Sequence, residues 1–109
     1  MASDVTLVLT TTPSSDAGLD LVESLVRERH AACGTVLPGG VSVYWWQGRV
    51  VREPEALVLL KTAGDHTDAL LTRIAELHPY DVPEALAFPV ERGHEPYLSW
   101  VLSEVSSNP

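Results

Sequence analysis

Two long runs of β-favouring residues, joined by Gln47 and Gly48, place the strongest constraint on how this chain folds. Residues 41–46 and 49–62 are rich in β-branched and aromatic side chains, and only those two residues separate them. Gly48 suits the left-handed backbone of a tight turn or of an adjoining bulge. Pro54 cannot donate a ladder hydrogen bond, so the second run must bulge there or lie at a sheet edge. We therefore expect a long β-hairpin whose second arm continues into a core strand.

Hydrophobic periodicity and breaker residues predict the other elements. A serine or aspartate within 14–16 caps a helix whose apolar stripe runs toward Ala32, and Pro79 ends a later helix at His78. The expected elements are a strand at 5–11, a helix from 14–16 toward 32, a strand at 36–46 interrupted at 38–40, a strand at 49–62, a helix from 65 to 78, a strand at 84–90 and a helix from 95 or 96 through 102 or beyond. This order predicts a single α+β domain over residues 1–109, a two-layer sandwich with its helices on one face of the sheet.

Charge and cysteine content restrict the partners and the compartment. Fifteen acidic residues against seven basic ones give a formal net charge of −8, which repels polyanions and argues against nucleic-acid partners. No apolar run is long enough to cross a membrane, and the first residues carry no basic leader, so we expect neither a membrane span nor secretion. The single Cys33 cannot form an intrachain disulfide, which favours a reducing compartment and predicts a cytoplasmic protein.

Trp45 and Trp46 are neighbours in the first arm of the predicted hairpin, so their side chains point to opposite faces. They cannot both enter one core, and a sheet covered on one face leaves an indole and much apolar surface exposed. Self-association accounts for such a surface, because tryptophan is enriched at the centres of interfaces. The alternative is a partly exposed tryptophan at a hairpin tip, which needs no partner.

The run from His78 to Glu84 carries the densest group of candidate functional side chains. Between Pro79 and Pro83 stand a phenol and a carboxylate, with the imidazole of His78 before them and Glu84 just after. Imidazole and carboxylate suit divalent copper or zinc, but a tight site needs three or four convergent ligands, so this turn supplies half a site. The alternative is that the prolines end a helix and the polar groups cap its last carbonyls.

Short motifs along nearly the whole chain resemble the CutA family of divalent cation tolerance proteins. They are residues 29–33, Pro38 with Gly39, Ser42, Tyr44, Trp45, Trp46 and Gly48 of the hairpin, Lys61 with Thr62, His78, Pro79, Tyr80, Pro83 and Glu84, and residues 97–101. The resemblance implies a ferredoxin-like arrangement. It also implies a homotrimer in which the long hairpin helps to join neighbouring subunits, with clefts between subunits close to the turn at His78.

The resemblance assigns candidate site residues as well. It implies an intersubunit ligand-binding cleft lined by Tyr44, Trp46, Lys61, Tyr80 and Tyr97. A divalent cation, copper or zinc, would be held by His78, Glu84 and Cys33. Some copper-binding relatives carry extra thiols on the first strand and second helix, whereas Thr10 and Arg73 stand at the corresponding positions here, which argues against copper binding by those ligands.

The sequence holds no nucleophile and base at recognisable spacing, no glycine-rich phosphate loop and no paired carboxylates with separable roles. We therefore expect a protein that is not an enzyme and requires no cofactor, and that binds divalent cations or a small ligand weakly in the clefts of a trimer. A second hypothesis is a regulatory trimer resembling PII-type signalling proteins, which binds a small anionic metabolite through Lys61 and the neighbouring turn. A purely structural trimer is the third.

Overall fold

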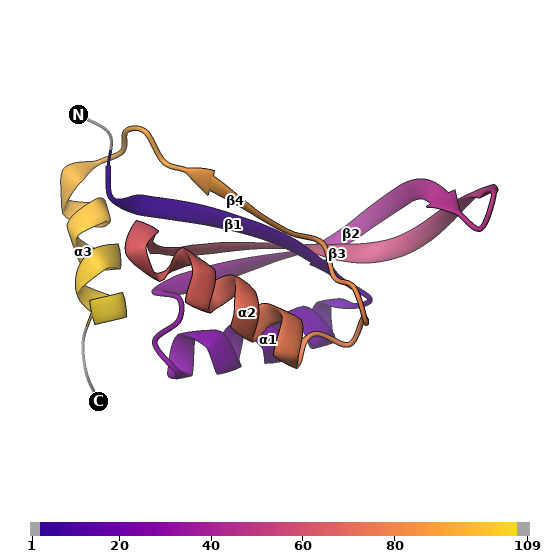
Figure 1. The fold of residues 1–109 in the computed structure, drawn as a ribbon, viewed down its shortest axis with the longest axis horizontal. Helices are drawn as coiled ribbons and strands as arrows, with labels where there is room; N and C mark the ends of the chain where they lie inside the picture. Colours follow the sequence, from indigo (N-terminus) through magenta and orange to yellow (C-terminus); the bar gives the residue numbers. More distant parts are fainter. Residues whose placement is uncertain (1–2, 107–109) are drawn as a thin grey trace.

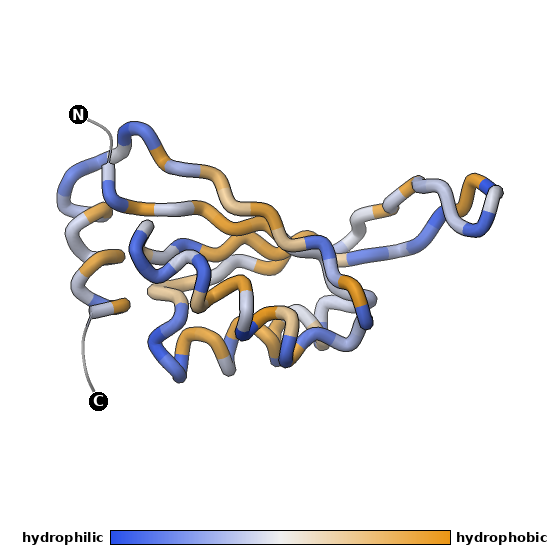
Figure 2. Tube along the Cα trace, viewed as in Figure 1, coloured by the Kyte–Doolittle hydropathy of each residue, from blue (hydrophilic) through white to orange (hydrophobic). Residues whose placement is uncertain are grey.

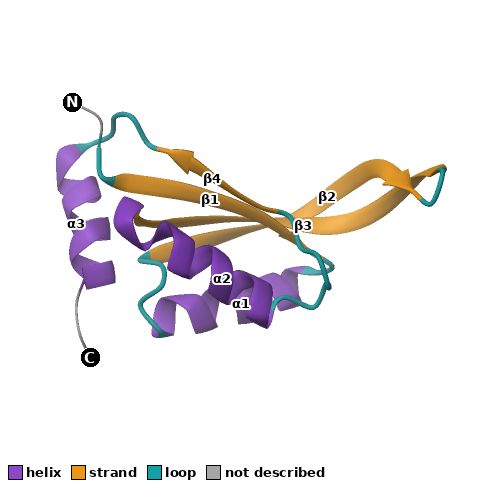
Figure 3. Ribbon diagram, in the orientation of Figure 1, coloured by secondary structure: helices purple, strands orange, loops and turns teal. Residues whose placement is uncertain are grey.

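The computed structural model describes residues 3–106, in which four strands form one antiparallel sheet in the order β2-β3-β1-β4 (Figure 1). The elements are β1 (Val5–Thr12), α1 (Ser15–Arg27), β2 (Cys33–Trp46), β3 (Arg49–Ala63), the 3-10 turn η1 (Gly64–His66), α2 (Thr67–Leu77), β4 (Ala85–Pro89) and α3 (Glu95–Ser106). This order of strands and helices is that of a ferredoxin-like sandwich with one added helix (Figure 3). The predicted α+β fold class is confirmed.

Two element ends differ by three residues or more from the sequence-based expectation, and the others differ by at most two. α1 ends at Arg27, short of the predicted end, because Arg29 adopts a left-handed backbone with φ 65° and reverses the chain. β2 begins at Cys33 rather than at residue 36, since its first residues already pair with β3. No helix within residues 3–106 is both long enough and apolar enough to span a membrane.

The β2–β3 hairpin extends beyond the rest of the sheet, because β1 pairs with β3 only as far as Ala56 (Figure 1). The predicted bulge lies at Pro38 and Gly39, at a register shift in the pairing with β3, and Gly39 has a positive φ of 85°. Pro54 lies past the end of β1, so the N–H group that proline lacks is not needed for a hydrogen bond to that strand. Both sequence-based expectations for the hairpin arms are thus confirmed.

One face of the sheet packs against α1 and α2 and forms the main core. Val8, Val58 and Leu60 point to this face and are completely buried against Leu25 of α1 and Leu70 of α2. Ser14 caps α1 as predicted, with its hydroxyl oxygen accepting a hydrogen bond of 3.1 Å from the amide of Ala17. The outer arm of β3 is hydrophilic by comparison with the strands in the body of the sheet (Figure 2).

The expectation that all helices pack on one sheet face is wrong for α3. Val5 and Ala63 point away from α1 and α2, because side chains alternate along a strand, and they pack against Leu98 and Val101 of α3. α3 therefore crosses one end of the opposite face (Figure 1). Apolar side chains from all four strands lie on the remainder of this face, here called the open face: Leu7, Leu9, Leu37, Leu57, Leu59, Leu86 and Phe88.

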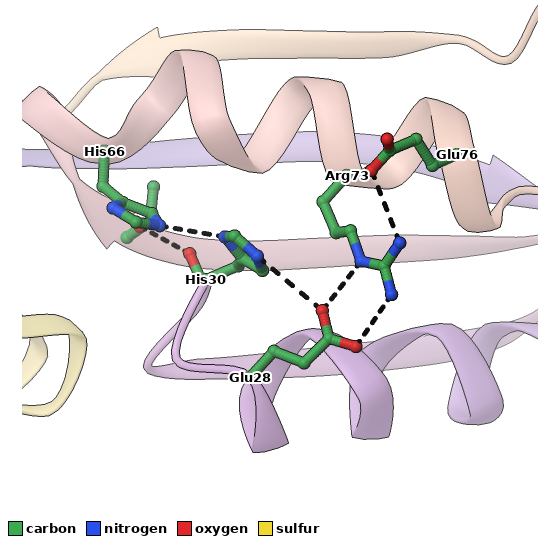
Figure 4. A network of polar contacts seen from close by, with 6 residues as sticks. Glu28, His30, His66, Arg73 and Glu76 are labelled. Atoms are coloured by element: carbon green, nitrogen blue, oxygen red, sulfur yellow. Dashed lines mark hydrogen bonds and ion pairs between the residues drawn. The ribbon is translucent and has the colours of Figure 1, made fainter. Parts of the chain in front are cut away.

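A polar network joins the end of α1 to α2 (Figure 4). The guanidinium of Arg73 donates two hydrogen bonds, of 2.8 and 3.0 Å, to the carboxylate of Glu28, and a third of 3.4 Å to Glu76. These contacts hold the pKa of Glu28 below its usual range. His66, the N-cap residue of α2, belongs to this network as a half-buried partner of His30.

The main core predicts a large cost for truncating Leu60. Leu60→Ala removes buried methyl groups from a side chain with 0% exposure and leaves a cavity, so we expect a loss of about 2–5 kcal/mol in the free energy of unfolding. Urea denaturation at one fixed protein concentration measures this. Leu19→Ala, at a position on α1 that is 54% exposed, is the matched control and should stay within about 0.5 kcal/mol of the parent. Equal losses in both variants would contradict this account of the core.

Candidate functional site

A hollow of about 500 Å³ lies between the hairpin and the turn that joins α2 to β4. Its lining comes from β1, from both hairpin arms and from the turn: Thr11, Tyr44, Trp46, Glu55, Tyr80, Asp81, Val82 and Glu84. Three of the predicted cleft residues, Tyr44, Trp46 and Tyr80, therefore meet here, together with the predicted metal ligand Glu84. We call this hollow the acidic cleft, since three of its side chains are carboxylates.

His78 builds the turn rather than facing the acidic cleft. Its side chain is 7% exposed, and both ring nitrogens are engaged by backbone groups. Nε2–H donates to the carbonyl oxygen of Thr11 at 2.7 Å, and Nδ1 accepts the amide hydrogen of Tyr80 at 3.1 Å. These two bonds require the Nε2–H tautomer and leave no lone pair for a metal ion. The imidazole thus fixes the turn against β1, which is a structural role that the sequence motif does not reveal.

Tyr80 and Glu55 form the polar centre of the acidic cleft. The phenol of Tyr80 donates a hydrogen bond of 2.7 Å to the carboxylate of Glu55. Burial, followed by this carboxylate, raises the pKa of Tyr80 well above its usual range, so the phenol stays protonated and remains a donor. Burial and the carboxylates of Glu53 and Glu55 also raise the pKa of Tyr44.

The carboxylates give the acidic cleft its chemical character. Glu55, Asp81 and Glu84 line it, whereas none of the described lining residues is a lysine, arginine or histidine. Carboxylate oxygens are ligands for divalent cations, and a group of them on one surface attracts cations and repels anions. The aromatic rings of Tyr44 and Trp46 supply an apolar wall. The wall that carries the three carboxylates can therefore bind a cation, and the opposite side of the cleft is open to solvent.

The remaining predicted residues lie at the other end of the open face. Cys33 pairs with Lys61 across β2 and β3, and its sulfur lies 3.3 Å from the hydroxyl of Tyr97 on α3. Burial and the contact with Cys33 raise the pKa of Tyr97 to about 12. Tyr97 also packs beside Trp100, with ring centroids 5.8 Å apart. We call this group the thiol end of the open face.

The three residues predicted to hold a metal, His78, Glu84 and Cys33, do not converge within one subunit. Glu84 lines the acidic cleft, and Cys33 belongs to the thiol end. His78 does not face the cleft, because its ring is hydrogen-bonded to the backbone of Thr11. Residues 3–106 hold no group of three or more histidine, cysteine, aspartate or glutamate side chains placed to bind one metal ion. A complete site therefore requires groups from more than one subunit, or water.

Sequence reasoning missed two contributors to the acidic cleft. Glu55 follows Pro54 in a strand and carries no motif, so only the pairing of the hairpin with the turn reveals its contact with Tyr80. Thr11 of β1 also lines the cleft, and its backbone carbonyl anchors His78, a contact that no residue-type pattern can identify. A larger hollow, of about 600 Å³, lies between the start of β1 and the second half of α3, and none of the predicted site residues lines it.

The strand order, the protruding hairpin and the acidic cleft beside it define a small α+β protein with ferredoxin-like topology and an acidic hollow on its surface. Comparison with known proteins identifies it more closely. The chain belongs to the CutA1 divalent ion tolerance protein family, whose family model matches residues 6–104. The predicted family is thus confirmed.

Individual relatives match over most of their length. The divalent-cation tolerance protein CutA of Yersinia pestis (strain Pestoides F) is 42% identical over 99 residues, which cover 91% of this chain and 83% of the relative. The crystal structure of CutA from Xylella fastidiosa has a TM-score of 0.93 and 43% identity, covering 95% of this chain and 100% of its own. The divalent cation tolerance protein of Thermus thermophilus has a TM-score of 0.88 and 41% identity, covering 92% of this chain and 97% of its own.

The two hydrogen bonds of His78 predict a structural penalty for its removal. His78→Ala leaves the buried carbonyl of Thr11 and the amide of Tyr80 without these partners, so we expect a loss of about 1–3 kcal/mol in the free energy of unfolding. Hydrogen exchange should show faster exchange of the Tyr80 amide in the variant. His94→Ala, at an exposed position, is the control. A stable His78→Ala protein with an unchanged Tyr80 amide would refute this role.

Proposed function

We propose that this chain acts as a homotrimeric divalent cation tolerance protein of the CutA type, which binds copper or zinc weakly in clefts between subunits. It works by binding and needs no resident cofactor. The observation that carries the proposal is the acidic cleft, whose carboxylates from the hairpin and the α2–β4 turn face an open side. The lone Cys33 is consistent with action in the cytoplasm.

The open face supports self-association. Leu37, Leu86 and Phe88 stay exposed on it although they lie on a sheet that is well packed on its other face. The hairpin adds two large exposed side chains, Trp45 at 74% and Trp46 at 60% exposure. Neither indole enters the core of its own subunit, so apolar surface is available on both sides of the hairpin. A closed trimer would cover three open faces at once.

Assembly would also complete the binding site. The acidic cleft and the thiol end lie at opposite ends of the open face, so one subunit cannot bring Lys61, Cys33 and Tyr97 to Glu84. In a ring of subunits the acidic cleft of one copy can meet the thiol end of the next, which joins the two groups of predicted site residues. A cation would then be held by Glu55, Asp81 or Glu84 with ligands from the neighbour. Weak binding follows, because no subunit preforms the ligand set.

A regulatory trimer that binds a small anionic metabolite is the second candidate. Lys61 favours it, since its ammonium makes no ion pair within residues 3–106 and projects from the open face. The carboxylates of the acidic cleft oppose it, because they repel an anion. The cation is therefore the better ligand for the cleft itself.

The proposed assembly predicts a trimer at micromolar concentration. Sedimentation equilibrium should give about three times the mass of the 11.8 kDa chain. Phe88→Glu places a charge on the open face, so we expect it to dissociate the assembly. Leu19→Glu, on the outer side of α1, introduces the same charge and should leave the trimer intact. A monomeric parent protein, or the same response in both variants, would refute the open face as the interface.

The acidic cleft predicts a specific loss of cation binding. Calorimetric titration with Cu²⁺ and Zn²⁺ should show weaker binding in Asp81→Asn/Glu84→Gln than in the parent, by about tenfold for the lost ligands. Asp20→Asn/Glu23→Gln removes the same charge from the exposed side of α1 and should change the affinity little. Unchanged binding in the cleft variant would exclude the proposed site. Binding of a phosphorylated metabolite that is lost in Lys61→Ala, without a response to metal, would favour the second candidate.

A further inference from the structure

His30 and His66 face one another at the opposite end of α2 from the acidic cleft. His30 follows α1, and His66 precedes the first residue of α2. The Nδ1 atom of His30 lies 2.9 Å from Nε2 of His66, and the two rings are tilted by 37° with centroids 5.1 Å apart (Figure 4). Two imidazole nitrogens at this distance share one proton between two lone pairs.

The two rings are held in place from both sides. The carbonyl oxygen of His30 accepts a hydrogen bond of 2.8 Å from the hydroxyl of Thr62 in the core strand β3. His66 is fixed by its position at the N-terminal end of α2. The pair is thus preorganised on two packed helices and one strand, yet both side chains are only half-buried and remain within reach of solvent.

We propose that His30 and His66 form a two-histidine chelate for a divalent transition-metal ion, with Cu²⁺ preferred to Zn²⁺. The ion accepts a lone pair from each of the two facing nitrogens, and the proton between them moves to the second nitrogen of the ring that carried it, so each imidazole keeps one N–H. Two nitrogens bound at ~2.0 Å and at right angles around tetragonal copper lie ~2.8 Å apart, close to the 2.9 Å observed. A tetrahedral zinc ion needs ~3.3 Å. Water fills the remaining positions, and each ring turns so that its lone pair points at the metal.

The surrounding charges favour a cation at this position. Oε1 of Glu28 lies 3.7 Å from Nε2 of His30, on the side of the ring away from His66 (Figure 4). A carboxylate behind a metal-bound histidine is the usual outer partner of such a site. Arg73 brings the opposite charge nearby, but it is paired with both Glu28 and Glu76, so the cluster carries one net negative charge.

This chelate is separate from the acidic cleft. His66 and His78 lie at opposite ends of α2, whose eleven residues span about 16 Å. Metal binding by the pair therefore requires neither the carboxylates of the cleft nor the neighbouring subunit. The two sites can be disabled one at a time.

The test is a titration of the full chain with Cu²⁺ in the Asp81→Asn/Glu84→Gln background, which removes the cleft ligands. We expect one copper ion to bind per subunit, because the two facing ring nitrogens form one chelate. Calorimetry measures the stoichiometry and the affinity. Adding His30→Gln or His66→Gln should weaken binding at least tenfold, and Zn²⁺ should bind the unaltered pair less tightly than Cu²⁺.

His94→Gln, on an exposed segment, is the matched control and should leave copper binding unchanged. A second measurement avoids any folding defect of the variants: substoichiometric Cu²⁺ should broaden the imidazole NMR signals of His30 and His66 before that of His94. Unchanged affinity in His66→Gln, an equal loss in His94→Gln, or broadening of His94 first would each overturn the proposal. Because the cleft is already disabled, these outcomes say nothing against the intersubunit site.

Discussion

The alternation of side chains along β1 and β3 divides the molecule into two faces, and the core, the proposed assembly and the candidate site depend on this division. Val8, Val58 and Leu60 point to the face that α1 and α2 cover. Leu7 and Leu59 point the other way, to a face that α3 covers only at one end. One strand therefore stabilises the subunit with half of its side chains, and in the proposed trimer a second copy would contact the other half.

The open face also explains why the candidate site is incomplete in one subunit. The acidic cleft lies at the hairpin end of this face, and Cys33 with Lys61 and Tyr97 lies at the α3 end. The proposed trimer places a neighbour against this surface and supplies the missing side of the cleft. Binding and assembly would then be coupled, because a cation held by two subunits stabilises the assembled state over the separate chains.

His78 shows that a family marker need not be a ligand. Its ring joins the α2–β4 turn to β1 through one donated and one accepted hydrogen bond. This leaves Tyr80 pointing at Glu55 and the turn carboxylates lining the cleft. The proposed copper ligands are instead His30 and His66, which face each other at the other end of α2. Position in the fold, rather than residue type, separates a scaffold imidazole from a ligand imidazole.

Local periodicity, breaker residues and backbone preference were enough to predict the order of elements, the hairpin and the bulge at Pro38 and Gly39. It also predicted that the adjacent indoles of Trp45 and Trp46 could not share a core. Three features emerge only from the folded molecule: α3 crosses the opposite face, Glu55 contacts Tyr80, and His30 contacts His66. Such contacts join residues far apart in the chain, and their geometry depends on how the helices dock on the sheet, which no local pattern encodes.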